Sequence, residues 1–221
     1  RLKEEMDAVL EAVEKGELPE EEINAKCRKV LTYKYILGLE RKPFVKLSGL
    51  GTRINTPQTR DLISRLNLAA ITVLNNKNDV LPLHPDLKEA AILNVGKPEE
   101  IEPFDRKMKK YTSFARFQLR KDLPEAEQQK LRDSLATYRR VIVTVTEQRL
   151  APYQSFFAKF APESPVIYVF YTPAKSMLQI QRAVSAAEAV VLAHASRDDV
   201  QERVADLLFG KATADGRLSA S

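Results

Sequence analysis

The sequence has few of the residue types that build metal sites and disulfides. Tryptophan is absent, cysteine occurs once and histidine occurs twice among 221 residues. One cysteine excludes an internal disulfide, and together with two histidines it cannot complete a structural zinc site. We therefore expect no bound metal. Cys27 lies on an apolar helical stripe, which predicts a buried structural thiol rather than a nucleophile.

Long hydrophobic runs and targeting patterns are also missing. No stretch of about 18 apolar residues occurs, so we expect no membrane span, and no signal-peptide pattern is present. Hydrophobic residues nevertheless make up 44% of the chain, which is typical of a globular protein. The chain begins with Arg1 inside a predicted helix, and we therefore expect it to be a piece of a longer protein.

The net charge of +5 is not concentrated in one segment. Residues 1–38 carry seven basic and nine acidic residues, so the positive excess belongs to the remainder, where it is spread over many predicted helices. The densest cluster, Arg106–Lys110, is typical of a solvated helix face. We expect no nucleic-acid partner, although a basic interaction module remains an alternative.

The first 38 residues predict two helices. Apolar residues recur at helical spacing up to Gly16, and a second helix begins at Pro19, is followed by an acidic first turn, and ends at Gly38. The apolar faces of this pair need a partner. Residues 39–56 contain prolines and glycines without a sustained period and are interpreted as a linker.

Residues 57–221 predict one α/β domain. A helix is expected from Pro57 to about residue 74, with an apolar stripe that includes Leu62, Leu66 and Val73. A strand–helix alternation follows from about residue 89. The predicted strands are Ala90–Val95, Ser113–Leu119, Val141–Thr146, Val166–Tyr171 and Ala189–Ala193. The predicted helices cover about 98–110, 124–137, 151–161, 175–185 and 197–209. This order implies a parallel, doubly wound, flavodoxin-like sandwich of about five strands.

The carboxyl ends of parallel strands are the usual ligand site in such sheets. Gly96 follows the first strand without a glycine-rich phosphate loop, so no nucleotide cofactor is expected. Glu147 follows the third strand and is the best-placed carboxylate, a weak candidate for catalysis beside its simpler interpretation as a surface acid. His194 follows the fifth strand and could meet Glu147, but no nucleophile accompanies them. His84 is expected on the surface in a turn. We find no complete catalytic site.

Three separated stretches resemble the C-terminal part of glycoside hydrolase family 3. Lys34–Leu39 resembles the family's "K…GL" ending of the catalytic barrel. Ala70–Leu83 is similar to the segment that opens its second domain and ends in "vLPL". Ala205–Leu218 resembles its closing "lfG…GrLP". Two departures are Val73-Leu74-Asn75-Asn76 in place of Leu-Leu-Lys-Asn, and Leu218-Ser219 in place of Leu-Pro.

The resemblance is greatest to the Bacteroidetes-type β-N-acetylhexosaminidase group, with the β-glucosidase group as the runner-up. It implies that residues 1–38 end a (β/α) barrel, that residues 57–221 form a non-catalytic α/β domain, and that the nucleophile lies in a barrel missing from this chain. It also implies a carbohydrate substrate for the full-length enzyme and a periplasmic or secreted location. In the glucosidase group the second domain can supply a glutamate as acid, and Glu147 is the only candidate for that role here.

A stand-alone α/β ligand-binding module is the principal alternative. A receiver-like domain needs acidic residues at the ends of its first and third strands. Those ends are Val95-Gly96 and Thr146-Glu147 here, which argues against a receiver.

Overall fold

The computed structural model describes residues 2–41, 46–84, 87, 89–160 and 165–218. The chain divides into two compact units, Arg1–Thr56 and Pro57–Ser221, and each is described by itself.

The described part of the first unit contains three helices, α1 (Leu2–Glu14), α2 (Glu20–Ile36) and α3 (Leu50–Ile54). Gly16 and Gly38 end the two longer helices, as predicted, because both adopt the positive φ that closes a helix. At Gly38 the amide donates to the Tyr35 carbonyl and the following amide donates to the Lys34 carbonyl, which satisfies two of the last carbonyls of α2. The predicted linker contains one element that sequence analysis missed, the short helix α3; residues 42–45 lie outside the described part.

The prediction of a buried Cys27 is wrong. Neither α1 nor α2 contains a buried residue, and the Cys27 thiol is exposed. The helical stripe that suggested burial is present, but an amphipathic face is buried only when a second layer packs against it. Within the described residues of this unit, no such layer covers α2.

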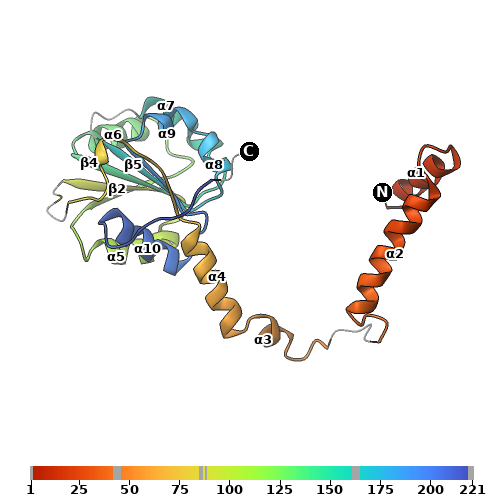
Figure 1. Cartoon of the computed structure of the whole chain (residues 1–221). Coiled ribbons are helices and arrows are strands. Elements are labelled where there is room, and N and C mark those ends of the chain that lie inside the picture. Colours follow the sequence, from red (N-terminus) through yellow and green to blue (C-terminus); the bar gives the residue numbers. More distant parts are fainter. Residues whose placement is uncertain (1, 42–45, 85–86, 88, 161–164, 219–221) are drawn as a thin grey trace. The chain divides into compact units, whose positions relative to one another are not determined.

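The second unit is a six-stranded sheet with helices on both faces, which confirms the predicted α/β class (Figure 1). The strands are β1 (Thr72–Asn76), β2 (Ala90–Val95), β3 (Ala115–Leu119), β4 (Arg140–Val145), β5 (Val166–Phe170) and β6 (Ala189–Leu192). Their order is β1-β6-β5-β4-β2-β3, and every neighbouring pair is parallel except β1 with β6. The five predicted strands are therefore all present, and a sixth joins them at one edge.

The sixth strand corrects the prediction for residues 70–74. The helix α4 (Pro57–Ala69) ends earlier than expected, and Thr72–Asn76 pairs antiparallel with β6. The β-branched Thr72 and Val73 favour an extended strand, and the buried backbone of β6 offers them hydrogen-bond partners. The expected stripe on α4 is also wrong in part, because Leu62 and Leu66 are exposed whereas Leu68 packs against the core.

Alternation along the strands divides the core into two layers. Ile92, Ile142 and Ile167 face the layer under α5 (Glu102–Met108) and α10 (Asp198–Leu208). Leu93, Val143 and Tyr168 face the opposite layer, under α6 (Glu125–Ala136), α7 (Gln154–Lys159) and α9 (Gln181–Ala186). Figure 1 shows α5 and α10 on one side of the sheet and α6, α7 and α9 on the other. Burial on both faces is why these strands read as continuous apolar runs.

Several predicted helices are shorter or divided in the structure. The helix expected over 98–110 starts as a 3-10 turn, η2 (Pro98–Ile101), before α5, and the helix expected over 151–161 starts as η3 (Ala151–Tyr153) before α7. The helix expected over 175–185 is split into α8 (Lys175–Leu178) and α9. The expected helix end at residue 161 lies outside the described residues.

The two resemblance segments of the second unit pack against each other. The Leu83 amide donates to the Leu208 carbonyl over 2.6 Å, and the Gly216 amide donates to the Ile71 carbonyl over 3.1 Å. A β-carbon at Gly216 would lie 2.6 Å from the Ile71 carbonyl oxygen. The closing segment can therefore come this close to Ile71 only because residue 216 is glycine. Residues 70–83 and 205–218 thus form one structural feature, which we call the closing contact.

Candidate functional site

The carboxyl ends of four strands meet at one edge of the sheet. Val95 pairs with Val145, Val145 with Phe170, and Phe170 with Leu192. The next residues along each strand therefore lie together, and they include Gly96, Thr146, Tyr171 and the loop after β6. The chain turns to opposite sides after β2 and β4, which is the kind of switch point where α/β sheets bind ligands.

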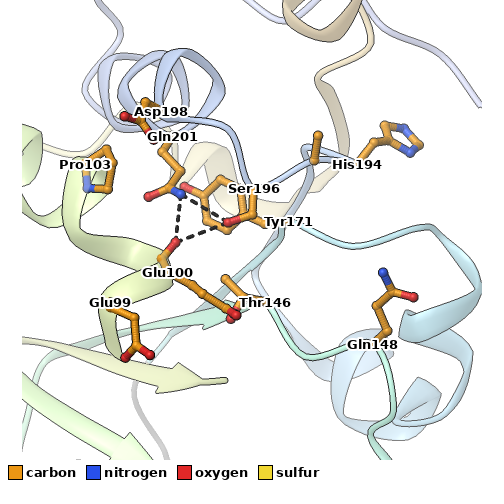
Figure 2. Close-up of a pocket in the computed structure, with 11 residues that line it drawn as sticks. Glu99, Glu100, Pro103, Thr146, Gln148, Tyr171, His194, Ser196, Asp198 and Gln201 are labelled. Carbon is orange, nitrogen blue, oxygen red and sulfur yellow. Dashed lines mark hydrogen bonds between the residues drawn. The ribbon is translucent and has the colours of Figure 1, made fainter. Parts of the chain in front are cut away.

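A hollow of about 430 Å³ lies at this edge. Its lining consists of Glu99, Glu100, Pro103, Thr146, Gln148, Tyr171, His194, Ala195, Ser196, Asp198 and Gln201. Figure 2 shows His194 and Gln148 on one side of the hollow and Glu99, Glu100 and Pro103 on the other. We call it the strand-end pocket. Hydroxyl, amide and carboxylate groups dominate its wall, and neither lysine nor arginine contributes to it.

Gln201 holds one wall of the strand-end pocket in place. Its side chain is 1% exposed, and its amide donates to the Glu100 carbonyl over 2.8 Å and to the Ser196 hydroxyl over 3.1 Å (Figure 2). The Gln201 side-chain oxygen accepts from the Phe104 amide. Every polar atom of this buried side chain is therefore satisfied, and α10 is linked to η2 and to the loop after β6.

The loop after β4 is fixed by Gln179. The Gln179 side chain accepts from the Leu150 amide and donates to the Gln148 carbonyl, each over 2.8 Å. The backbone around Gln148 is therefore fixed by two hydrogen bonds, at the Gln148 carbonyl and at the Leu150 amide. Gln179 lies between α8 and α9, so the break in the predicted helix has a structural role.

The loop after β2 rests on a buried polar network. Asn94 accepts from the Thr144 hydroxyl over 3.2 Å and donates to the Gln118 side chain over 3.0 Å. Gln118 in turn donates to the Gly96 carbonyl over 2.6 Å. A β-carbon at Gly96 would lie 1.9 Å from the Thr146 hydroxyl, so only glycine allows this close approach.

Glu147 and His194 do not form the pair that sequence analysis considered. His194 lines the pocket, whereas Glu147 turns back on its own loop and accepts from the Arg149 amide over 3.0 Å. Within the described residues, no hydrogen bond or ion pair joins the two side chains. The Glu147 charge does act on Tyr153, because burial first, and then Glu147 and Asp122, raise the pKa of that phenol.

The other sequence candidates lie away from the strand-end pocket. His84 is exposed, as expected. In the basic cluster, Met108 is buried in the core, and Arg106 and Lys107 form ion pairs with Glu202 and Asp206 of α10. The cluster is therefore largely a solvated helix face with intramolecular partners.

Sequence reasoning missed Tyr171, Gln201 and Asn94, which shape the site most. A usable signal existed for Gln201, because this amide directly follows Val200 in a helix whose other inward positions are apolar. Asn94 likewise interrupts the apolar run of β2. Buried polar side chains among apolar neighbours are retained only where hydrogen bonds satisfy them, and their position therefore marks a network.

Two further features, a metal-binding cluster and a membrane-spanning helix, are absent from the described ranges. No three His, Cys, Asp or Glu side chains there come close enough together to hold one ion. No helix in these ranges has both the length and the apolar character needed to cross a bilayer.

Several solved structures have a fold similar to that of this chain. No family model matches the sequence, and no curated protein matches it. The β-glucoside phosphorylase BglX matches over 96% of this chain at 18% identity with a TM-score of 0.61, and a glycoside hydrolase family 3 β-N-acetylglucosaminidase from Paenibacillus sp. str. FPU-7 over 96% at 18% with 0.55. A β-glucosidase from Listeria innocua matches over 91% at 15% with 0.54.

The fold matches that of the C-terminal α/β domain in glycoside hydrolase family 3. This chain spans only 40%, 41% and 32% of the lengths of the three family 3 neighbours. At such low identity the likeness establishes a shared fold and not a shared activity.

Proposed function

We propose that this chain is the C-terminal, non-catalytic part of a family 3 glycosidase that removes terminal β-linked N-acetylhexosamine or, less favoured, β-glucose residues. Residues 1–38 would complete a catalytic barrel, residues 39–56 would connect it, and residues 57–221 would pack on it. The observation that carries the proposal is the coverage. Nearly the whole of this chain matches less than half of each neighbour, and two stretches of the resemblance meet in the closing contact.

The exposed apolar residues of the first unit support the same proposal. Leu2, Met6 and Leu10 on α1 are 57–73% exposed, and Val30 and Leu31 on α2 are more than half exposed. Leu2, Met6 and Leu10 are spaced by four residues and so share one face of α1, and an exposed apolar helix face of this kind is typical of an interface. In the proposed protein, the remaining barrel elements cover it.

The test compares this chain with the longer gene product. Both are assayed on p-nitrophenyl N-acetyl-β-glucosaminide and p-nitrophenyl β-glucoside, with and without inorganic phosphate, because one neighbour is a β-glucoside phosphorylase. We expect turnover only by the longer protein, with the N-acetyl substrate preferred. Turnover by residues 1–221 alone at a comparable rate would contradict the proposal, as would an inert longer protein.

The proposal that this part of the enzyme is non-catalytic is tested at Glu147, the one candidate in it for an acid role in the longer enzyme. A general acid contributes about 10²–10⁴-fold for a poor leaving group and little for p-nitrophenol, which leaves without protonation. If Glu147 is the acid, Glu147→Gln lowers kcat/KM for an alkyl glycoside by at least about 100-fold and spares kcat/KM for the p-nitrophenyl substrate, because that ratio reports the step that releases the leaving group. Equal rates for variant and wild type on both substrates would remove Glu147 from the site. Glu99→Gln is a control, since this carboxylate lines the pocket from a different element.

A further inference from the structure

The strand β3 forms one edge of the sheet and pairs with β2 alone. At the other edge, the segment around Gly216 lies against the start of β1. Within the described residues, no backbone group outside β2 forms a hydrogen bond with the backbone of Ala115–Leu119. An edge strand of this kind presents a row of unpaired amides and carbonyls, to which an extended segment of another chain can add.

The hydrogen bonds of β2 show which groups of β3 point outward. The Val95 carbonyl accepts from the amide that follows β4, so the backbone of Val95 points toward β4. Successive residues of a strand point their backbone groups to opposite sides, and Asn94 therefore points toward β3, where it lies opposite Gln118. In a parallel pair, a residue in this position bonds to the two neighbours of the residue opposite it. The amide and carbonyl of Gln118, and by the same alternation those of Arg116, therefore point out of the sheet.

Positive charge surrounds this edge. Residues 109–121 contain β3 and its flanks, and they include five basic residues but neither aspartate nor glutamate. The five cations are all exposed: Lys109, Lys110, Arg116, Arg120 and Lys121. Acidic groups reach them only from other elements, because Asp105 pairs with Arg116 and Glu127 lies 4.0 Å from Arg120. In the described ranges the three lysines form no ion pair, which leaves their charge available to a partner.

The charge decides which kind of segment fits. A second copy of this chain would bring its own β3 and place like charges opposite one another, which destabilises a strand pair. Nucleic acid would attract the cations, but phosphate oxygens only accept hydrogen bonds and cannot pair with the outward carbonyls of Arg116 and Gln118. An acidic peptide meets both requirements, because its backbone carries donors and acceptors and its carboxylates complement the cations.

The two faces of β3 favour different side chains in the partner. Arg116 lies on the face toward α5, where it pairs with Asp105. Phe117 lies on the opposite face in an edge-to-face contact with Tyr138, and both rings are partly buried. The side chains of an added strand alternate between the same two faces. Acidic side chains therefore fit beside Arg116 and apolar side chains fit beside Phe117.

We propose that the open edge of β3, defined by the outward backbone of Arg116 and Gln118, binds an extended segment of a partner protein in which acidic and apolar residues alternate. The segment adds a further strand to the sheet, with main-chain hydrogen bonds to these two residues and carboxylates near the five cations. This inference concerns residues 57–221 and does not depend on the proposed function.

The test is a titration of the chain, residues 1–221, with a synthetic peptide of about eight alternating glutamate and valine residues, long enough to span β3. We expect saturable amide chemical shifts along β3 and slower hydrogen exchange at the Arg116 and Gln118 amides. The same peptide N-methylated at every amide keeps its carboxylates but cannot donate from its backbone, and it should bind at least about tenfold more weakly. A peptide with lysine in place of glutamate should give no saturable shift.

Three results would overturn the proposal. The first is the absence of saturable shifts with the acidic peptide, and the second is equal affinity for its N-methylated form. The third is an occupant of another class at the same edge: a single-stranded oligonucleotide that binds there more tightly than the peptide, or a dimer of the chain that protects the Arg116 and Gln118 amides without any peptide.

A matched pair of double variants assigns the binding to this edge. Lys110→Glu with Lys121→Glu reverses two exposed charges that flank β3 and should weaken binding of the acidic peptide about tenfold. Lys175→Glu with Arg182→Glu is the control, because it makes the same change of charge on α8 and α9, between β5 and β6.

An equal loss in both double variants, or no loss in either, would overturn the assignment. Should the first variant fail to fold, the affinity of the unmodified chain at about 50 mM and about 500 mM sodium chloride tests the same charges, because salt screens exposed cations. Equal affinity at the two salt concentrations would also overturn it.

Discussion

The missing β-carbon of a glycine can allow two backbone segments to come into close contact. Gly216 has its amide on the Ile71 carbonyl, and an added β-carbon would lie within 2.7 Å of three atoms of residues 70–72. Gly51, in the interior of α3, has no atom within 4 Å of the same position. The sequence does not distinguish these two glycines, because only the folded chain brings residue 216 to residue 71.

The substitution Gly216→Ala is therefore expected to weaken the second unit. Forcing a methyl group into this contact costs about 2 kcal/mol, in the range seen for overpacked sites. Gly51→Ala should leave the melting of the sheet unchanged, since no neighbour obstructs the methyl group. Thermal unfolding followed by circular dichroism compares the two variants. Equal melting temperatures for Gly216→Ala and wild type would show that the closing contact does not stabilise the domain.

Elements are joined by ion pairs of unequal burial. Asp105 of α5 is paired with Arg116 of β3, and the carboxylate side chain is only 7% exposed. Arg106 of the same helix is paired with Glu202 of α10, but both partners are about half exposed or more. A buried carboxylate that loses its partner keeps the cost of desolvation, whereas an exposed pair contributes little.

Arg116→Ala is expected to destabilise the link between α5 and β3 by about 2 kcal/mol, because Asp105 would remain buried without its cation. Arg106→Ala is the matched control on α5 and should change stability by less than about 0.5 kcal/mol. Urea denaturation of both variants gives the two differences. A loss as large for Arg106 as for Arg116 would mean that burial of the carboxylate does not govern the effect.

At the level of elements, sequence periodicity identified the strands whose two faces are covered by helices. It failed for the strand whose conformation depends on hydrogen bonds to a neighbouring strand. The strands β4 and β5 were predictable because they are apolar on both faces, which is characteristic of a covered parallel strand. The segment Thr72–Asn76 was not, because its apolar residues also fit a helical stripe and only the hydrogen bonds to β6 select the strand. The strand-end location of the site followed from topology, whereas the Tyr171 and Gln201 contacts depend on side chains that lie far apart in sequence.

The tyrosines of the second unit predict that the whole unit loses stability at alkaline pH. The hydrogen bond to Asp206 raises the pKa of Tyr111 to about 12, and burial raises the pKa of Tyr168 and Tyr171. A phenol whose pKa is higher in the folded state than in the unfolded chain favours folding below the unfolded pKa of about 10, and this contribution is lost as the pH rises.

We therefore expect the free energy of unfolding to fall between pH 9 and pH 11, values chosen on either side of the unfolded tyrosine pKa of about 10. Tyr111→Phe should reduce the size of this fall, since the substituted ring cannot ionise. Urea denaturation at the two pH values measures both. A pH dependence that is identical in the variant and wild type would exclude Tyr111 from the effect.

The closing contact also bears on how the domain is made. The edge strand β1 pairs with β6, the last strand, and residues 70–72 receive the segment around Gly216, so the beginning and the end of the domain depend on each other. Contacts between such distant segments form late and slowly. During synthesis on the ribosome, the Ile71 carbonyl lacks its partner, the Gly216 amide, until nearly the whole domain has emerged. The neighbouring strand β1 stays unpaired until β6 has emerged, and chaperones can bind it during that time. A message truncated before residue 189 would then yield a chain that lacks the partner strand of β1.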